Sequence, residues 1–438
     1  MHTIVQDESE LGVRGEKAYN LCPNSLLYST TMVDRGEHLD ISVVGGGIVG
    51  LSCAYELQRH DGVSVTVYEK NDSIGEGVTP RAAGGFRSLY SSPTHVELSL
   101  VSNNFWRDFE DEFGMDVDLR INGYGFFTRE RTTAEHVRGD VHMQQNLGVD
   151  SEYLSSQEMA ERFPGVTSTG FRPGSFCKSD GLVDPRLTLS AYEKLAREAG
   201  VEIRLGTEVT GVQKEDGITG TNPITGIELQ DETVNADYIV NAAGAWGARL
   251  AEMAGVEVPI YPKRRNGVLV EPETPIPEDW PFLIDLDTGL WMRPSPSQDP
   301  EGTVMIGGEF GESDPAKNPD APEMLSDRVD TEWAGTALRH AADIVEHIGA
   351  NPEILRGWSG MYAITPSNHP IIEESVPGFV NAIGNSGRGF MQSPAIGKLV
   401  SDIVMDQDTV PINTEVLRTD GLVDKRGSLP LPYQADRD

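Results

Sequence analysis

The chain has 438 residues, of which 38% are hydrophobic, so it is long enough for two domains with a sizeable core. Its 69 acidic and 35 basic residues give a net charge of −34, which argues against nucleic acids and anionic membrane surfaces as partners. No stretch approaches the roughly 20 apolar residues of a membrane-spanning helix, and no secretory signal pattern opens the chain. We therefore expect a cytoplasmic protein without a membrane span.

The acidic residues are spread along the whole chain, and only nine of the basic residues are lysines. Such a composition resembles that of proteins from salt-loving archaea, because concentrated counterions relieve the repulsion within an acidic fold. An ordinary acidic protein of a mesophile is the alternative. Cys22, Cys53 and Cys177 show no paired spacing, and the nine histidines form no close cluster, so we expect reduced, packed cysteines and no metal site.

The first clear elements follow a polar segment, 1–37, which we interpret as an N-terminal extension. A buried strand is expected at 41–44, then a glycine-rich turn at 45–50 (GGGIVG), a helix, and a second strand at 63–68 that is closed by Glu69. This order is typical of a dinucleotide-binding unit. The glycines let the backbone and the helix N-terminus approach a pyrophosphate, and the acid binds a ribose. The turn by itself leaves open whether the dinucleotide is NAD or FAD.

Two later apolar runs also end in glycine. The run 236–243 leads into Gly244 and a short helix, and the run 379–383 leads into a glycine-rich turn and a helix expected from about Pro394 to Val404. Because the carboxyl ends of the strands of a doubly wound sheet meet in one crevice, we expect the three glycine-rich turns to line a single ligand site.

The segments between these strands contain further β-like runs, which predict a second sheet that caps the crevice. We therefore expect an α/β fold: a Rossmann-type nucleotide-binding domain with a second, mainly antiparallel β-sheet substrate domain of α+β type. The expected boundaries are 1–37 for the extension, 38–112, 176–256 and 353–408 for the discontinuous nucleotide-binding domain, 113–175 and 257–352 for the cap domain, and 409–438 for a C-terminal tail.

Five motifs in this order resemble the amine-oxidising flavoproteins related to D-amino-acid oxidase, which include glycine oxidase and sarcosine oxidase with its β subunits. The resemblance covers about 38–408. The motifs are the turn 45–50 with Glu69, the segments 81–87 (RAAGGFR), 180–185 (DGLVDP) and 241–246 (NAAGAW), and the pair 358–366 (WSGMYAITP) and 384–391 (GNSGRGFM). The last glycine motif has no counterpart in NAD dehydrogenases, so the resemblance implies FAD.

The resemblance also implies a set of FAD-binding residues and a reaction. These residues are Gly45, Gly46, Gly47, Ile48, Val49, Gly50, Glu69, Lys70, Ala83, Gly84, Gly85, Val209, Ala243, Gly244, Trp246, Gly387, Arg388, Gly389, Phe390 and Met391. The reaction is hydride transfer from a carbon next to nitrogen to flavin N5, after which the imine product hydrolyses. The implied substrate is a small secondary amine or amino acid, sarcosine-like or proline-like.

The chain departs from the family at several functional positions. Relatives with covalently bound flavin carry a cysteine where this chain has Gly360, or a histidine where it has Arg81, so FAD is expected to be non-covalent. Oxidases of the sarcosine type place a lysine near N5 where this chain has Met305, which favours a dehydrogenase that passes electrons to an acceptor protein. The relatives' carboxylate-binding lysine and arginine are replaced by Met391 and Tyr362.

A substrate carboxylate still needs a charged and preferably bidentate partner, for which the candidates are Arg87, Arg388 and Arg293. Tyr124 could donate a hydrogen bond to the same group. The expected catalytic residues are Arg87, Tyr362, Arg388 and Met305. The alternative function is that of a non-catalytic FAD protein that assists the assembly of a larger respiratory complex.

The composition generates a prediction about salt. Screening shortens the Debye length from about 10 Å at 0.1 M to about 3 Å at 1 M, so most of the repulsion that arises from the charge of −34 should be removed by about 1 M salt. We expect the melting temperature to rise from low salt into molar KCl. A melting temperature that stays flat or falls over this range would contradict the assignment to a salt-loving organism.

Overall fold

The computed structural model describes residues 38–167, 173–215, 223–310 and 315–420. The expected N-terminal extension, and with it Cys22, lies outside these ranges. The glycine-ended strands are neighbours in one six-stranded sheet, as the sequence predicts. In spatial order its strands are β18 (Ile371–Val376), β19 (Phe379–Ile383), β12 (Tyr238–Asn241), β1 (Leu39–Val44), β2 (Val63–Tyr68) and β8 (Glu202–Arg204).

This sheet is parallel except at one edge, where β18 runs antiparallel to β19. Both faces of the sheet are covered, which is why its strands are almost continuously apolar. Ile41 and Val43 on β1 pack into the core beneath α1, α5 and α8, and Val44 packs into a second core with α6. The eight α-helices of the described residues are α1 (Ile48–Gln58), α2 (Pro93–Phe113), α3 (Arg131–Asn146), α4 (Ser156–Arg162), α5 (Pro185–Ala199), α6 (Gly247–Met253), α7 (Thr331–Ile344) and α8 (Gly389–Met405).

Two small sheets and four short helices complete the fold of the described residues. The small sheets consist of β11 (Thr233–Asn235), β10 (Ile224–Glu228) and β9 (Gly211–Lys214), and of β3 (Gly85–Phe86) with β7 (Gly181–Leu182). The three-stranded sheet contributes Ile224 and Ile227 to the core that contains α6. The short 3₁₀ helices are η1 (Thr79–Arg81), η2 (Gly244–Trp246), η3 (Glu346–Ile348) and η4 (Glu415–Leu417).

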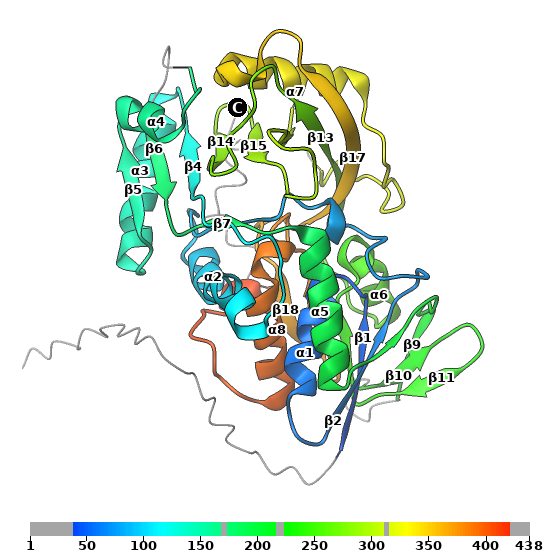
Figure 1. The fold of residues 1–438 in the computed structure, drawn as a ribbon. Helices are drawn as coiled ribbons and strands as arrows, with labels where there is room; N and C mark the ends of the chain where they lie inside the picture. Colours follow the sequence, from blue (N-terminus) through cyan, green and yellow to red (C-terminus); the bar gives the residue numbers. More distant parts are fainter. Residues whose placement is uncertain (1–37, 168–172, 216–222, 311–314, 421–438) are drawn as a thin grey trace, which may run out of the picture. The chain divides into compact units, whose positions relative to one another are not determined.

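The second large sheet is mainly antiparallel, as expected, with one parallel pair between β14 and β4. Its outer face packs against α7, which contributes Ala334, Ala337 and Ala341 to a core with Val304 and Ile306 (Figure 1). In spatial order its strands are β17 (Glu353–Ile364), β13 (Tyr261–Glu271), β16 (Val304–Gly308), β15 (Trp291–Pro294), β14 (Phe282–Asp285), β4 (Tyr124–Phe127), β6 (Gly174–Cys177) and β5 (Ser151–Leu154). The expected fold class is confirmed.

Two expected boundaries are wrong. Strand β17 is expected in the nucleotide-binding domain, but it pairs along its whole length with β13 and so belongs to the second sheet. The expected C-terminal tail is structured up to residue 420, because Val410 and Leu417 are buried in the core beneath α1 and α8. The carboxylate of Asp402 anchors this segment by accepting hydrogen bonds from the backbone of Thr409 and Val410. None of the helices in the described ranges is both long and apolar enough to cross a bilayer.

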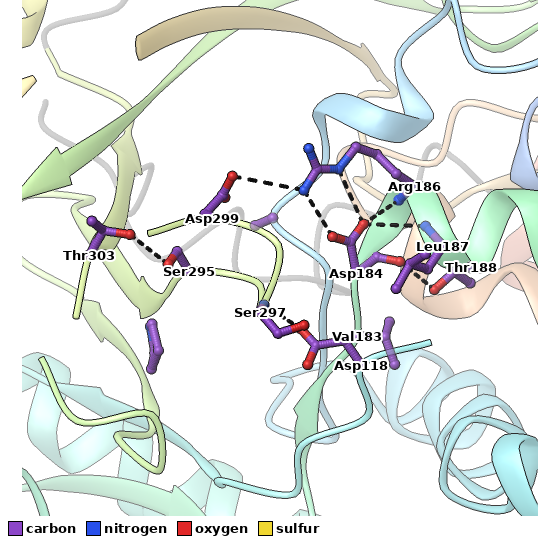
Figure 2. A network of polar contacts seen from close by, with 12 residues as sticks. Asp118, Val183, Asp184, Arg186, Leu187, Thr188, Ser295, Ser297, Asp299 and Thr303 are labelled. Carbon is purple, nitrogen blue, oxygen red and sulfur yellow. Dashed lines mark hydrogen bonds and ion pairs between the residues drawn. The ribbon is translucent and has the colours of Figure 1, made fainter. Parts of the chain in front are cut away.

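A polar network fastens the loop between β15 and β16 to the start of α5 (Figure 2). Asp184 caps α5 by accepting hydrogen bonds from the backbone of Arg186 and Leu187, and its carboxylate also pairs with the Arg186 side chain at 3.0 Å. The Arg186 side chain reaches Asp299 in the loop at 4.0 Å. A second arginine, Arg356 on β17, pairs with Asp299 at 2.9 Å. The carboxylate of Asp299 thus connects α5, which packs against the six-stranded sheet, to β17 of the second large sheet.

The network predicts that Asp299 stabilises the junction. Its side chain is 4% exposed, so Asp299→Ala leaves two arginines without this partner and should lower the free energy of unfolding by about 1–3 kcal/mol, measured by urea denaturation in low salt. The matched control is Glu301→Ala, which removes the same charge from an exposed position of the same loop and should change stability by less than about 0.5 kcal/mol. Equal stability of the two variants would contradict the prediction.

Candidate functional site

A cavity of about 580 Å³ runs from the carboxyl ends of β1, β2 and β12 to the inner face of β13 and β17. It therefore lies where the strand ends of the six-stranded sheet meet the second sheet, which is the site expected for the three glycine-rich turns. Nearly all residues expected to bind FAD line it: Gly45, Gly47, Ile48, Val49, Glu69, Lys70, Ala83, Gly84, Gly85, Val209, Ala243, Gly244, Trp246, Gly387, Arg388, Gly389, Phe390 and Met391.

The first glycine-rich turn presents backbone rather than side chains to the cavity. Gly45 has φ +112°, and a Cβ there would lie 2.5 Å from the carbonyl oxygen of Ala242 at the end of β12. A Cβ at Gly50 would lie 1.9 Å from the carbonyl oxygen of Gly45, so Gly50 serves packing and does not line the cavity. Helix α1 begins immediately after Gly47, and its N-terminus provides the N–H groups and the positive dipole end that suit a phosphate.

Glu69 follows β2 and is held in a defined orientation at the cavity wall. Its carboxylate accepts hydrogen bonds from the backbone of Gly46 at 2.8 Å and of Asn71 at 3.0 Å. Gly46 itself does not line the cavity, so its contribution is to orient Glu69. Beside them, the Lys70 ammonium lies 3.8 Å from the centroid of the Trp246 ring. A carboxylate with spare lone pairs next to an aromatic ring fits the ribose and adenine of a dinucleotide.

The segment 83–87 lines the cavity through Ala83, Gly84, Gly85 and Arg87. Gly84 has φ +70°, and a Cβ there would lie 2.2 Å from the carbonyl oxygen of Val183, so only glycine allows this close approach. The adjoining strand β3 pairs with β7, which holds the segment in place. Arg87 leaves this strand with a side chain that is 5% exposed and lines the cavity.

The last glycine-rich turn leads directly into α8. The helix begins at Gly389 and not near Pro394 as expected, so Arg388 is its N-cap and the helix N-terminus faces the cavity. Pro394 in the second turn has no N–H to donate to the carbonyl oxygen of Phe390. The hydroxyl of Ser393 donates to this oxygen instead, so the helix tolerates the proline. Gly387 has φ +80° and packs against the ring of Tyr362, where a Cβ would lie 2.3 Å from a ring carbon.

One end of the cavity is rich in arginine and aromatic side chains, and we call it the arginine end. Its defining residues are Arg87, Tyr124, Arg265, Trp291, Glu309, Tyr362 and Arg388. Burial raises the pKa of both Tyr124 and Tyr362, so these hydroxyls stay protonated and can act as hydrogen-bond donors. Tyr124 stacks on Phe282 at a ring distance of 4.2 Å, which holds its ring in place.

Two buried guanidinium groups converge at this end. Arg87 and Arg388 are 5% and 4% exposed, and their Cζ atoms lie 4.0 and 5.7 Å from the centroid of the Tyr90 ring. Neither has an ion-pair partner within the described part of the chain. Arg87 donates to the carbonyl oxygen of Leu89, and Arg388 donates to those of Asn368 and Ser386, while its Nε has no partner among these residues. Burial lowers the pKa of Arg388 to about 10, so it remains charged at neutral pH.

Arg265 and Glu309 are not among the site residues expected from the sequence. Arg265 lies on β13 and Glu309 immediately follows β16, and the pairing of these strands places Asn266 opposite Gly308. The Nε atom of Arg265 donates to Glu309 Oε1 at 2.7 Å, and both side chains line the cavity. Neither residue belongs to a local motif. The alternation of side chains along β13 indicates which of its residues share a face of the sheet, but it does not indicate which strand pairs with β13.

Two expected site residues lie elsewhere. Met305 is 4% exposed and does not line the cavity, because the wall on this strand begins only at Gly308. Arg293, its neighbour on β15, is fully buried and donates to the carbonyl oxygens of Ala83 and Pro294. Met305 is therefore wrong as a residue of the cavity wall, and Arg293 supports the segment 83–85 from behind rather than reaching the cavity.

The cavity wall in the described ranges contains neither cysteine nor histidine. Cys53 and Cys177 are free and buried, as expected, and burial raises the pKa of the Cys177 thiol to about 12. No group of three or more potential metal-ligating side chains occurs in the part of the chain that the structure describes. Gly360 lines the cavity without offering a reactive atom.

Comparisons with known proteins agree with this geometry. FAD-dependent oxidoreductase domain-containing protein 1 of Xenopus laevis is 25% identical over 416 residues, which cover 84% of this chain and 80% of that protein. The 4-methylaminobutanoate oxidase (formaldehyde-forming) of Paenarthrobacter nicotinovorans is 26% identical over 385 residues, 87% of this chain and 45% of that protein. Among solved structures, L-proline dehydrogenase from P. horikoshii superposes with a TM-score of 0.76 at 27% identity, covering 87% of this chain and 97% of that chain.

The model of one protein family, described as FAD dependent oxidoreductase, matches residues 40–403. This match spans both sheets and every motif of the cavity, and it decides between FAD and NAD, which the first glycine-rich turn left open. The chain belongs to the FAD dependent oxidoreductase family, and FAD is its cofactor.

Proposed function

We propose that this protein uses FAD to oxidise a small secondary amine or amino acid, sarcosine-like or proline-like, to an imine that then hydrolyses. The observation that carries the proposal is the pair of buried guanidinium groups of Arg87 and Arg388, which have no carboxylate partner among the described residues. Buried charge without a partner is costly, and a substrate carboxylate would supply the missing negative charge with strong, charge-assisted hydrogen bonds. Two relatives are named for molecules that carry both a secondary amine and a carboxylate, namely 4-methylaminobutanoate and L-proline.

When bound, FAD supplies the chemistry: it accepts a hydride from the carbon next to nitrogen. In the proposal, the α1 N-terminus after Gly47 holds the pyrophosphate and Glu69 holds the ribose. The N-terminus of α8 and the charge of Arg388 stabilise negative charge that develops on the ring system. Tyr124 and Tyr362 donate hydrogen bonds to the substrate carboxylate, and the aromatic walls exclude water.

For the second half of the reaction we propose a dehydrogenase that passes electrons to an acceptor protein rather than to oxygen. Oxidases of the sarcosine type place a lysine near flavin N5, and the described residues that define the arginine end include no lysine. The lysine among the lining residues, Lys70, lies beside Trp246, away from the arginine end. The alternative, a non-catalytic FAD protein that assists assembly, draws its support from the replaced carboxylate-binding positions. Arg87 and Arg388 offer a substitute for those positions and favour an enzyme.

The cofactor site leads to a prediction about FAD. Acid precipitation should release all flavin into the supernatant, because no cysteine or histidine of the described residues lines the cavity. Glu69→Ala should weaken FAD binding by about 1–3 kcal/mol, the usual effect of losing a hydrogen bond to a charged group, when the dissociation constant is measured by flavin fluorescence. The control Glu202→Ala removes an exposed acid on β8 and should leave binding unchanged. Flavin that stays with the precipitated chain would contradict non-covalent binding.

The proposed reaction is tested by anaerobic reduction of the flavin. Sarcosine, L-proline and related amino acids should bleach the flavin absorbance, and the reduced protein should reoxidise quickly with an artificial dye but slowly in air. Arg388→Met should raise the apparent dissociation constant of the reducing substrate about 10-fold to 100-fold, as expected when a charged hydrogen bond worth about 1.5–3 kcal/mol is lost. The control Arg339→Met removes an exposed charge on α7 and should have no effect.

Each part of this proposal can fail separately. Flavin that no amine reduces, although FAD is fully bound, would favour the assembly role. Rapid reoxidation in air without a dye would identify an oxidase. Equal behaviour of Arg388→Met and Arg339→Met would remove Arg388 from the substrate site.

A further inference from the structure

The arginine end of the cavity contains one carboxylate as well as three guanidinium groups. Arg87, Arg265 and Arg388 are the cations, and Glu309 is the acid among the described residues that define this end. A site for a purely anionic substrate, such as a phosphate ester or a simple carboxylic acid, gains nothing from an acid in its wall, because like charges repel. The acid therefore indicates that part of the substrate carries positive charge.

The carboxylate of Glu309 is held in place by its surroundings. The preceding residue, Gly308, has φ +156°, and a Cβ there would lie 2.6 Å from the carbonyl oxygen of Gly289, so the chain is tightly packed at the end of β16. Glu309 is 16% exposed, and Arg265 Nε donates to its Oε1 at 2.7 Å. A carboxylate offers about four lone-pair sites, so this bond leaves acceptor capacity, above all on Oε2.

The charge of Glu309 also acts on two other residues of the arginine end, Tyr362 and Arg388. Burial raises the pKa of Tyr362, and the negative charge of Glu309 raises it further. For Arg388 the effect of burial is opposite, and Glu309 partly offsets the lowering of its pKa. The geometry agrees with this, because Arg265, the partner of Glu309, has its Cζ 5.3 Å from the centroid of the Tyr362 ring, and that ring packs against Gly387 next to Arg388. A molecule that binds Arg388 through a carboxylate can therefore bring a neighbouring group to Glu309.

We propose that Glu309 recognises the amino group of the substrate, so that the cavity selects zwitterionic amino acids over hydroxy acids and phosphate esters. This inference rests on the proposed function and specifies the substrate class of the same site. The substrate carboxylate lies between Arg87 and Arg388, and its ammonium group donates a hydrogen bond to Glu309. Arg265 holds Glu309 in the orientation for this contact.

The same contact provides a route for a proton. The ammonium N–H bond breaks and its proton passes to Glu309, which leaves the nitrogen with a lone pair. The neighbouring C–H bond would then break, and FAD, once bound, would supply the two-electron acceptor for the hydride while the nitrogen lone pair forms a C=N bond. Water would hydrolyse the resulting iminium ion to a carbonyl compound and an amine, and the two electrons lost by the substrate would be those gained by the cofactor.

The test compares ligands that differ in one atom. In methoxyacetate an ether oxygen replaces the amine of sarcosine, and in tetrahydrofuran-2-carboxylate it replaces that of L-proline. Dissociation constants are measured anaerobically on the FAD-loaded protein, from the flavin spectrum or from the concentration dependence of flavin reduction. The wild type should bind the amine of at least one pair at least tenfold more tightly than its ether. Equal affinities in both pairs, or no binding of either amine, would overturn the inference without any variant.

Two variants localise the effect. Glu309→Gln should weaken binding of the amine at least tenfold and leave the ether unchanged or tighter, because the acid that repels the carboxylate is gone. Glu301→Gln removes an exposed acid from the preceding loop and should change neither. Equal weakening of amine and ether in Glu309→Gln would mean that Glu309 only supports the wall, and would overturn the inference.

The outcomes also separate this inference from the proposed function. Selective, Glu309-dependent binding of an amine that does not reduce the flavin would refute the oxidation and support the recognition. Reduction of the flavin by an amine that is unaffected by Glu309→Gln would support the oxidation and refute recognition of the amine by Glu309.

Discussion

The fold and its cavity depend on the close approach of backbone segments at a few glycines. At Gly45, Gly50 and Gly84 a Cβ atom would lie 2.5, 1.9 and 2.2 Å from a carbonyl oxygen of a neighbouring segment, distances that no side chain tolerates. These contacts bring the ends of β1 and β12 and the start of α1 against each other. As a result the wall of the cavity is built from backbone N–H groups and a helix terminus, which suit the long, phosphate-bearing cofactor of the family.

Charge is distributed very unevenly over this molecule. The chain as a whole carries a net charge of −34, yet the arginine end of its cavity places three guanidinium groups around one carboxylate. Such a concentration of positive charge inside an acidic protein costs desolvation free energy, which backbone carbonyl groups around Arg87 and Arg388 offset only in part. A bound anion would offset the remaining desolvation cost. The burial of these guanidinium groups therefore destabilises the free protein but favours binding of an anionic substrate group.

The cavity lies between two sheets, and its shape therefore depends on how firmly they are joined. Asp299 pairs with arginines from both sides of the junction: Arg186 from the first turn of α5 (Figure 2) and Arg356 from β17. Behind the cavity wall, Arg293 on β15 donates to the carbonyl oxygen of Ala83. These polar contacts hold the inner face of the second sheet against the segment 83–87, so that Tyr124 and Arg87 share one wall.

The sequence by itself determined the nucleotide-binding half of the site. The turn 45–50, Glu69 and the glycine-rich turn around Gly387 follow apolar runs with a spacing set by local backbone geometry, so the amino-acid sequence alone identifies them. The resemblance to the flavoproteins related to D-amino-acid oxidase added Gly84, and the mixed two-sheet architecture follows from the order of the apolar runs. The start of one helix was predicted wrongly, because a neighbouring side chain replaces a backbone hydrogen bond that proline cannot make. Helix α8 starts before Pro394 because the Ser393 hydroxyl serves the carbonyl oxygen that the proline leaves free.

The tertiary structure alone added Arg265 and Glu309 to the arginine end, where Arg87, Tyr124, Tyr362 and Arg388 were already expected. Arg265 and Glu309 are 44 residues apart and meet only because β13 pairs with β16. The alternation of β16 indicates which side chains share a face, but the extent of the cavity along the strand is set by packing against another sheet, which is why Met305 lies outside the wall and Glu309 within it. A linear motif records contacts along the chain, whereas the charge pattern of this site arises from contacts across strands.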